Sequence, residues 1–197
     1  MHFSCFLFTE KLPSDEDIDR ILKPYNDENF YSKYEEDEEG KKDIPPEDYP
    51  EFMWDWWQVG GRYSGLLKLK VDRDAEDEYR WGFYTEPRAG RLFRSSTLEE
   101  LLSHSERKWL YDEHYHMRHM GYNDGWLYVD GARIRDLINR DTLMYHCCCF
   151  VDPDGAAYAR ESWDGDTFVE SKHFDEVLRK TIEKYPDHYI TVIDIHD

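Results

Sequence analysis

Three histidine and aspartate residues in the carboxyl-terminal third of the chain could form a general base. Asp194 and His196 lie two positions apart in an apolar run, so we expect their side chains on the same face of a strand. A carboxylate that orients an imidazole is a common form of general base, and we add His146, from a second run that we expect to be a central strand. The alternative is that Asp194 only marks a strand end, because the sequence has no G-x-S-x-G motif and no recognisable catalytic cysteine.

The segment 54–65, W-D-W-W-Q-V-G-G-R-Y-S-G, is a second candidate site. Its paired glycines allow a sharp turn or a positive φ, and they let a ligand approach the backbone closely. The arginine could hold a phosphate or carboxylate while tryptophans stack on a base, although G-G-R matches no known nucleotide loop. The candidate ligand pocket consists of Trp54, Asp55, Trp57, Gly60, Gly61 and Arg62. The alternative is an aromatic cluster that seats a neighbouring loop on the sheet, with Asp55 and Arg62 as an internal ion pair.

A third group, Asp112, His116 and His119, could bind a metal ion. If a helix that we expect from Thr97 continues this far, the three side chains lie on one helical face at i, i+4 and i+7. The two histidines are three residues apart rather than the four of H-E-x-x-H, and histidines near carboxylates on an exposed helix are more often solvated. We therefore predict neither a metal nor another cofactor.

The net charge of the chain is −19, from 44 acidic and 25 basic residues. Direct binding to DNA or RNA and to anionic membranes is disfavoured, because affinity for phosphate comes from lysine and arginine. The acidic excess has two interpretations. It can serve solubility, or its carboxylates can mimic phosphates and occupy a basic groove on another protein.

Residues 27–51 form an acidic segment with eleven acidic residues and three lysines. Prolines interrupt it, so we expect a solvated loop, part of which folds back through its aromatic residues. We predict that this acidic segment binds the partner. Its phosphate-like charges would be Glu35, Glu36, Asp37, Glu38, Glu39, Asp43, Glu47 and Asp48, and its anchoring rings Tyr31, Tyr34 and Tyr49.

The length of 197 residues predicts a single domain, 1–197. No stretch has the roughly 18 to 20 apolar residues of a membrane span, and the amino terminus does not resemble a signal peptide, so we expect a cytosolic protein. Cys5 and the run 147–149 are expected to be reduced, buried thiols, because three neighbouring side chains on a strand cannot surround one metal.

Alternating or continuous apolar runs predict the elements of the fold. Expected strands cover residues 2–9, 64–71, 79–84, 91–95, 126–129, 143–151, 156–161 and 189–196. Expected helices follow Ser14, follow the capping box at Thr97 and continue toward Met120, and cover residues 174–185. Residues 152–155, D-P-D-G, predict the turn of a β-hairpin.

This order predicts an α+β fold with a mainly antiparallel sheet and two or three helices. Residues 52–140 are expected to be a long β-rich insertion that follows the acidic segment. Without the insertion, the remaining order is βαββαβ, which is the ferredoxin-like, split βαβ arrangement.

Two of these segments also carry a resemblance. The pattern W-D-W-aromatic-x-aliphatic-G-G-R-aromatic-S-G in residues 54–65 and T-V-I-D-I-H in residues 191–196 are similar to motifs of an uncharacterised family of phage and bacterial proteins. The resemblance implies a phage or mobile-element origin. It implies no activity that could be assigned to these residues.

These features predict a small acidic interaction protein that binds a cationic, nucleic-acid-binding surface of a host protein. It would act as a nucleic-acid mimic, and a defence nuclease such as a CRISPR effector is one such target. The alternative is an enzyme or binding protein for a nucleotide-like anion, with Arg62 on the anion and His196 or His146 as base. A structural or assembly protein is the third possibility.

Overall fold

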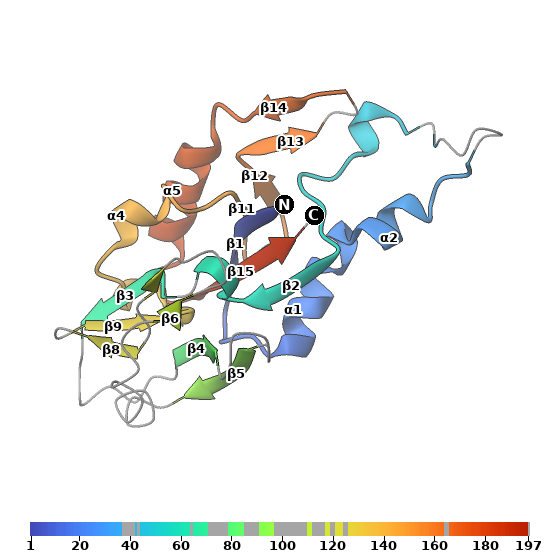
Figure 1. Cartoon of the computed structure of the whole chain (residues 1–197). Coiled ribbons are helices and arrows are strands. Elements are labelled where there is room, and N and C mark those ends of the chain that lie inside the picture. The colour runs from blue at the N-terminus through green and yellow to red at the C-terminus, as the bar shows by residue number, and fades with distance from the viewer. Residues whose placement is uncertain are drawn as a thin grey trace.

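The computed structural model describes residues 1–36, 42, 44–63, 65–70, 79–84, 91–96, 110–111, 117–118, 121–123, 126–163 and 166–196 (Figure 1). Among these residues, the side-chain environment is described for those that lie outside the range 69–127. The fold is α+β, with one large and mainly antiparallel sheet and four α-helices in the described part.

Two long apolar strands form the centre of the large sheet. β1 (His2–Thr9) and β15 (Tyr189–His196) pair antiparallel over their whole length, from His2↔His196 to Thr9↔Tyr189. Both strands are buried on both faces, which explains why their sequences are apolar without alternation. Full burial of side chains such as Phe6 and Leu7 contributes about 1.5–3 kcal/mol each.

The other strands of the large sheet extend it on both sides of this pair. Beside β1 lie β11 (Cys149–Val151), which is parallel to it, and then β12 (Ala157–Ala159) at the edge. β2 (Trp56–Val59) and β10 (Gly131–Arg133) both pair with β15, followed by β4 (Tyr79–Tyr84) and β5 (Arg91–Ser96). Residues from within 52–140 therefore complete the same sheet.

Three small sheets accompany the large one. They are formed by β3 (Leu67–Lys70), β9 (Trp126–Val129) and β8 (Gly121–Asn123), by β6 (Leu110–Tyr111) and β7 (Met117–Arg118), and by β13 (Glu161–Trp163) and β14 (Phe168–Glu170). The last of these is an exposed hairpin next to the edge strand β12.

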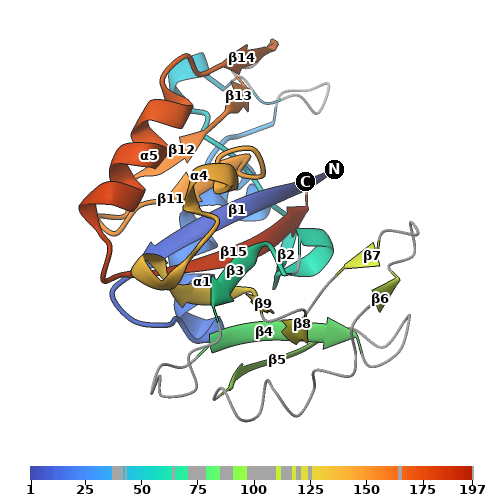
Figure 2. The same ribbon diagram turned by 90° about the vertical axis from the view of Figure 1, so that its left-hand side faces the viewer.

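Helices cover the two faces of the large sheet (Figures 1 and 2). Phe6 and Phe8 of β1 pack toward α5 (Phe174–Lys184), while Cys5 and Leu7 pack toward α1 (Asp15–Leu22). This division follows from the alternation of side chains along a strand. The remaining helical segments are α2 (Asp27–Tyr31), α4 (Arg140–Leu143), and the 3-10 turns η1 (Lys23–Tyr25), η2 (Pro46–Asp48), η3 (Gly61–Tyr63) and η4 (Ile134–Asp136).

Local signals predicted several of these elements. Ser14 caps α1, since its hydroxyl accepts the Asp17 amide while the Asp17 carboxylate accepts the Ser14 amide. The β11–β12 hairpin is present, and Asp152 accepts two amides of its turn. Its first strand is shorter than expected, because α4 ends only at Leu143 and residues 144–146 form a turn.

The strand order differs from the ferredoxin-like expectation. A split βαβ unit places an antiparallel strand between its two parallel strands. Here β1 pairs directly with β11, with Cys5 opposite Cys149, and β12 lies outside them. The ferredoxin-like order is therefore not confirmed, although the α+β class is.

The helix expected between Thr97 and Met120 is wrong over its second half. Leu110 pairs with Arg118 between the antiparallel strands β6 and β7, so no single helix spans residues 110–118. The proposed metal ligands Asp112, His116 and His119 lie outside the described residues.

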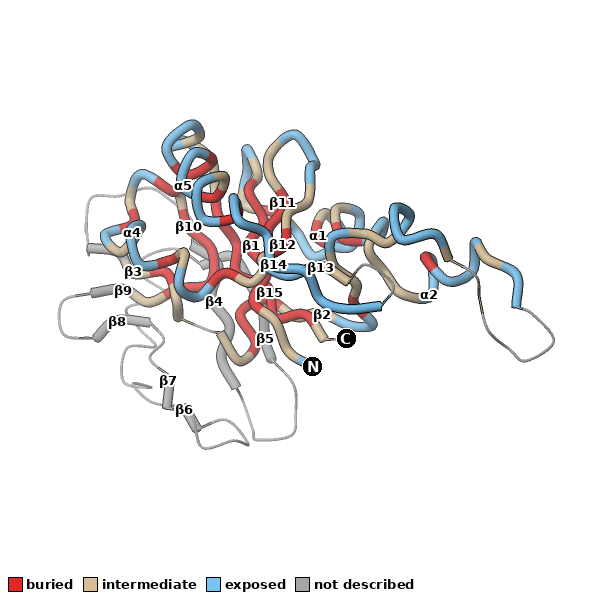
Figure 3. Tube along the Cα trace, turned by 90° about the horizontal axis from the view of Figure 1, so that it is seen from above, coloured by how far each residue is buried: buried red, intermediate tan, exposed pale blue. Residues whose placement is uncertain are grey.

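Burial is concentrated in β1, β15 and their neighbours, whereas α2 and the residues after it are mostly exposed (Figure 3). Among the described residues, no helix is long and apolar enough to cross a membrane.

Candidate functional site

The two sequence motifs lie side by side in the structure. β2 pairs antiparallel with the end of β15, with Trp56 opposite His196 and Val59 opposite Ile193. This pairing brings the turn η3, which contains the second glycine and the arginine of the G-G-R triplet, against the side chain of Asp194. Residues about 130 positions apart therefore form one local structure.

Asp194 is the buried centre of this structure, with 0% of its surface exposed. One carboxylate oxygen, Oδ2, accepts the backbone amide of Arg62 at 2.7 Å, and the other, Oδ1, lies 2.9 Å from Nδ1 of His2. Gly61 has φ +50, and a Cβ at this position would lie 2.0 Å from the Cβ of Asp194. The second glycine of the triplet is thus required because the carboxylate occupies the place of a side chain.

His196 forms a second aspartate–histidine pair. Its Nδ1 lies 2.8 Å from Oδ1 of Asp55, and its carbonyl accepts the Asp55 amide at 2.8 Å. Partial desolvation raises the pKa of Asp55, but hydrogen bonds from His196 and from the Trp56 amide outweigh it, so the pKa lies below its ordinary value of 3.8.

The two imidazole rings lie next to each other beside Trp56. The ring centroids of His2 and His196 are 4.9 Å apart in an edge-on arrangement, and the ring of Trp56 is nearly parallel to that of His196 at 5.8 Å. Trp56 is 39% exposed, and the histidine side chains are partly exposed. We call His2, Asp55, Trp56, Asp194 and His196 the paired-histidine cluster.

This cluster has the composition of an acid–base site. Each carboxylate contacts an Nδ1 atom and thereby orients the ring, so the Nε2 atom is the one that can exchange a proton with a ligand. Within the described residues, no group of three or more histidine, cysteine, aspartate or glutamate residues is arranged to hold a metal ion.

The catalytic set expected from the sequence is only partly brought together. Asp194 contacts His2 on the neighbouring strand instead of His196, because pairing between β1 and β15 places His2 diagonally opposite. His146 is exposed in a turn after α4, and it meets the sheet through its backbone, since its carbonyl accepts the Ser4 hydroxyl. The sequence reasoning missed His2 and Trp56, since a strand register joins them to the site.

The residues of the W-D-W-W and G-G-R segment that we expected to form one ligand pocket lie on two faces of the large sheet. Nε1 of Trp54 donates to the carbonyl of Leu22 at 2.8 Å, and Nε1 of Trp57 donates to Oδ1 of Asp19 at 2.8 Å. Both tryptophans therefore fix the β2 region to α1, as in the structural alternative.

The other members of that set have structural partners as well. Gly60 donates its amide to the carbonyl of Val192 at 2.7 Å with φ 70, which continues the sheet into η3. The expected ion pair between Asp55 and Arg62 is replaced by Asp55 with His196. The half-buried Arg62 contributes its backbone amide to Asp194.

The acidic segment, 27–51, extends outward from the sheet beyond α1 (Figures 1 and 3). Phe30 anchors it, since it is 2% exposed and contacts the rings of three tyrosines. These are Tyr31, Tyr34 and Tyr49, with centroid distances of 5.2, 5.4 and 5.4 Å. The expected anchoring rings therefore support the segment itself, and Tyr31 is exposed in addition.

Four of the eight carboxylates that we expect to mimic phosphates are described, and all four are exposed. These are Glu35, Glu36, Glu47 and Asp48, whereas Asp37, Glu38, Glu39 and Asp43 lie outside the described residues. Lys42 is 3.8 Å from Glu36 and donates to the carbonyl of Tyr31, and the hydroxyl of Tyr34 donates to Asp48. One lysine and one tyrosine thus hold the segment together without neutralising most of its charge.

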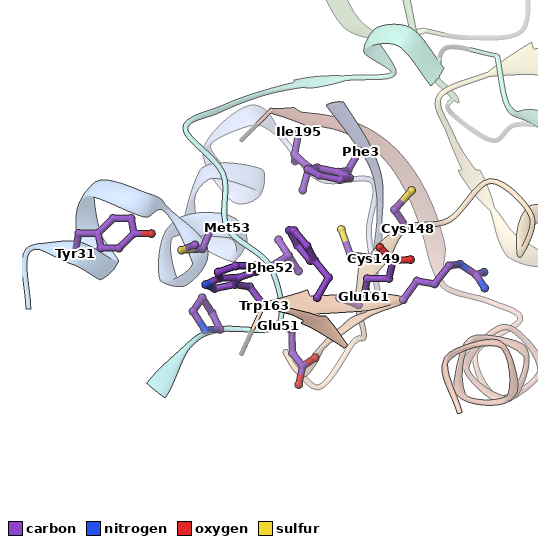
Figure 4. Close-up of a pocket in the computed structure, with 14 residues that line it drawn as sticks. Phe3, Tyr31, Glu51, Phe52, Met53, Cys148, Cys149, Glu161, Trp163 and Ile195 are labelled. Atoms are coloured by element: carbon purple, nitrogen blue, oxygen red, sulfur yellow. The ribbon is translucent and has the colours of Figure 1, made fainter. Parts of the chain in front are cut away.

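An apolar pocket of about 590 Å³ lies at the base of the acidic segment (Figure 4). Phe3 and Ile195 reach it from the large sheet, Phe52 and Met53 from directly after the segment, and Trp163 from β13. Sequence reasoning missed this pocket, because its walls come from parts of the chain that only the fold brings together.

No protein-family model, curated protein or solved structure matches the chain. The charge of the chain and the geometry of its described residues are therefore the basis for any functional proposal.

Proposed function

We propose that the protein binds a cationic, nucleic-acid-binding surface of a host protein and blocks it as a nucleic-acid mimic. The observation that supports this proposal most directly is the acidic segment, whose carboxylates Glu35, Glu36, Glu47 and Asp48 are exposed on an extension held by Phe30. A defence nuclease such as a CRISPR effector is a target of this kind, in line with the resemblance to phage proteins.

Electrostatics gives this proposal its physical basis. A net charge of −19 accelerates encounter with a basic surface and repels nucleic acid itself. Phe30 packs against three tyrosine rings in the unbound protein, so less conformational entropy is lost when the described part of the segment is buried by a partner. Exposed Tyr31 adds a ring next to the charges that can be buried against the partner.

Affinity capture from a nuclease-treated bacterial lysate tests the proposal. The variant Glu35→Lys/Glu47→Lys reverses two exposed charges in the acidic segment, and Glu10→Lys/Glu183→Lys makes the same change in net charge elsewhere on the surface. We expect wild type and the second variant to retain a nucleic-acid-binding protein that added oligonucleotide displaces, and the first variant to lose it. Capture that resists both charge reversal and high salt would contradict the proposal.

A second candidate function is acid–base catalysis on a phosphate ester, which the paired-histidine cluster favours. Two oriented imidazoles can supply a base and an acid while the substrate or water supplies the nucleophile. With bis(p-nitrophenyl) phosphate as the substrate, turnover should be lost in His196→Gln and kept in His146→Gln, whose exposed imidazole lies outside the cluster. Equal rates in both variants, or no rate above the background, would eliminate this candidate.

A further inference from the structure

The apolar pocket has a rim of uncompensated negative charge. Glu51 and Glu161 line the pocket and are exposed, and in the described part of the chain neither has an ion-pair partner. The cation beside them, Arg160, is already engaged, because its Nη2 lies 2.7 Å from Asp175 and donates to the carbonyl of Met144 at 2.7 Å. The charge that remains for a ligand is therefore negative.

The hairpin β13–β14 adds a second sign that a cation belongs at this rim. Glu161 is directly opposite Glu170 in the strand pair, and both side chains are exposed. Like charges that face each other across two strands destabilise the pair. A positive group that binds between these carboxylates would remove this repulsion.

Apolar surface surrounds the same opening. Phe168 is 61% exposed and Tyr31 36%, and the Phe168 ring contacts Trp163 at a centroid distance of 5.1 Å. Phe168 and Tyr31 both line the pocket. Exposed apolar side chains that gather around a pocket are typical of a binding surface.

From these observations we propose that the pocket receives an apolar side chain from a lysine- or arginine-rich peptide segment of the partner. This inference rests on the proposed function and names the part of the partner that is recognised. A phenylalanine or leucine fits within about 590 Å³, and its basic neighbours reach Glu51, Glu161 and Glu170. A nucleotide would bring phosphate to these carboxylates, and a second copy would bring a charge of −19, so both are disfavoured.

Two synthetic peptides, acetyl-KRKFKRK-amide and acetyl-KRKAKRK-amide, separate the pocket from general charge attraction. Burial of one phenylalanine side chain predicts that wild type binds the first peptide about tenfold more tightly or better, measured by calorimetry. Met53→Ala/Phe168→Ala should reduce this preference to about threefold or less, because it removes two walls of the pocket. The matched control, Ile138→Ala/Tyr145→Ala, truncates exposed apolar residues elsewhere and should keep the preference.

The failure of the pocket and the failure of the proposed function give different results. Glu35→Lys/Glu47→Lys should weaken both peptides by the same factor and leave the preference for phenylalanine unchanged. Equal affinity of wild type for the two peptides overturns the pocket inference, even when charge reversal weakens binding. A phenylalanine preference without dependence on salt or charge reversal supports the pocket and contradicts the electrostatic function. If Met53→Ala/Phe168→Ala does not fold, Glu51→Gln/Glu161→Gln tests the negative rim of the pocket instead, because it removes two charges and nearly preserves the size of the side chains.

Discussion

Oδ1 of Asp194 lies 2.9 Å from Nδ1 of His2, although 192 positions separate the two residues. The same carboxylate accepts the Arg62 amide, so one buried side chain connects the first strand, the last strand and the G-G-R turn. The W-D-W-W/G-G-R motif and the final strand motif therefore have a structural role, because they hold these three parts of the chain together. The histidines and Trp56 of the paired-histidine cluster are the partly exposed side of this unit.

Gly61→Ala should destabilise the fold strongly. The new Cβ would lie 2.0 Å from the Cβ of Asp194 in a backbone with φ +50, so both sterics and conformation oppose it. We expect a loss of about 3 kcal/mol or more in the free energy of unfolding, measured by urea denaturation. Gly155→Ala is the matched control, because Gly155 has φ +84 but nothing within 4 Å of its Cβ, and should cost only about 1 kcal/mol. Equal losses would show that the contact with Asp194 is unimportant.

Asp194→Asn should also destabilise the protein, by about 2–4 kcal/mol. The amide has the size of the carboxylate, but it is uncharged and has only one acceptor oxygen. It therefore cannot replace the carboxylate toward both the Arg62 amide and His2 in a site of 0% exposure. Asp187→Asn, which breaks an exposed ion pair with Arg135, should change stability by less than about 1 kcal/mol. Comparable values for the two variants in thermal unfolding would contradict the buried role of Asp194.

The pair of Asp55 with His196 predicts a small dependence of stability on pH. The pKa of Asp55 is depressed in the folded state, so its contribution is present above about pH 4 and is lost as the pH falls through the folded pKa. Because both side chains are more than a third exposed, the contribution should stay below about 1 kcal/mol. The difference in unfolding free energy between wild type and Asp55→Asn should therefore shrink toward pH 2. Glu10→Gln is the control, because Glu10 is exposed and has no ion pair among the described residues. A difference that grows on acidification would refute this assignment.

The cysteines should differ in their reactivity toward iodoacetamide. Burial raises the pKa of Cys147 and Cys149 well above 9.0, and Cys5 is also buried. Half-buried Cys148 should therefore be the thiol that reacts in the native protein at pH 8, followed by the others only after unfolding. Mass spectrometry of the native reaction checks this, and Cys148→Ser should abolish the early modification. Early labelling of Cys149 would contradict the burial of this strand.

The acidic segment shows how far local pattern reaches. Its prolines and carboxylates predicted an exposed segment, and the aromatic residues predicted that part of it would fold back. That Phe30 is the residue around which the tyrosines gather depends on contacts between residues up to nineteen positions apart. No periodicity in the sequence encodes this choice.

The sequence itself determined the types of several elements, because hydrophobic periodicity, the helix start at Ser14 and the turn D-P-D-G act over a few residues. The two central strands, the last helix and the charge of the surface belong to this local information. Tertiary structure alone decided that β1 pairs with β11 instead of β12, that Asp194 meets His2, and that distant parts of the chain enclose a pocket. The physical reason is that strand order and register minimise the energy of the whole sheet, so the partner of a buried carboxylate depends on residues that are distant in the chain.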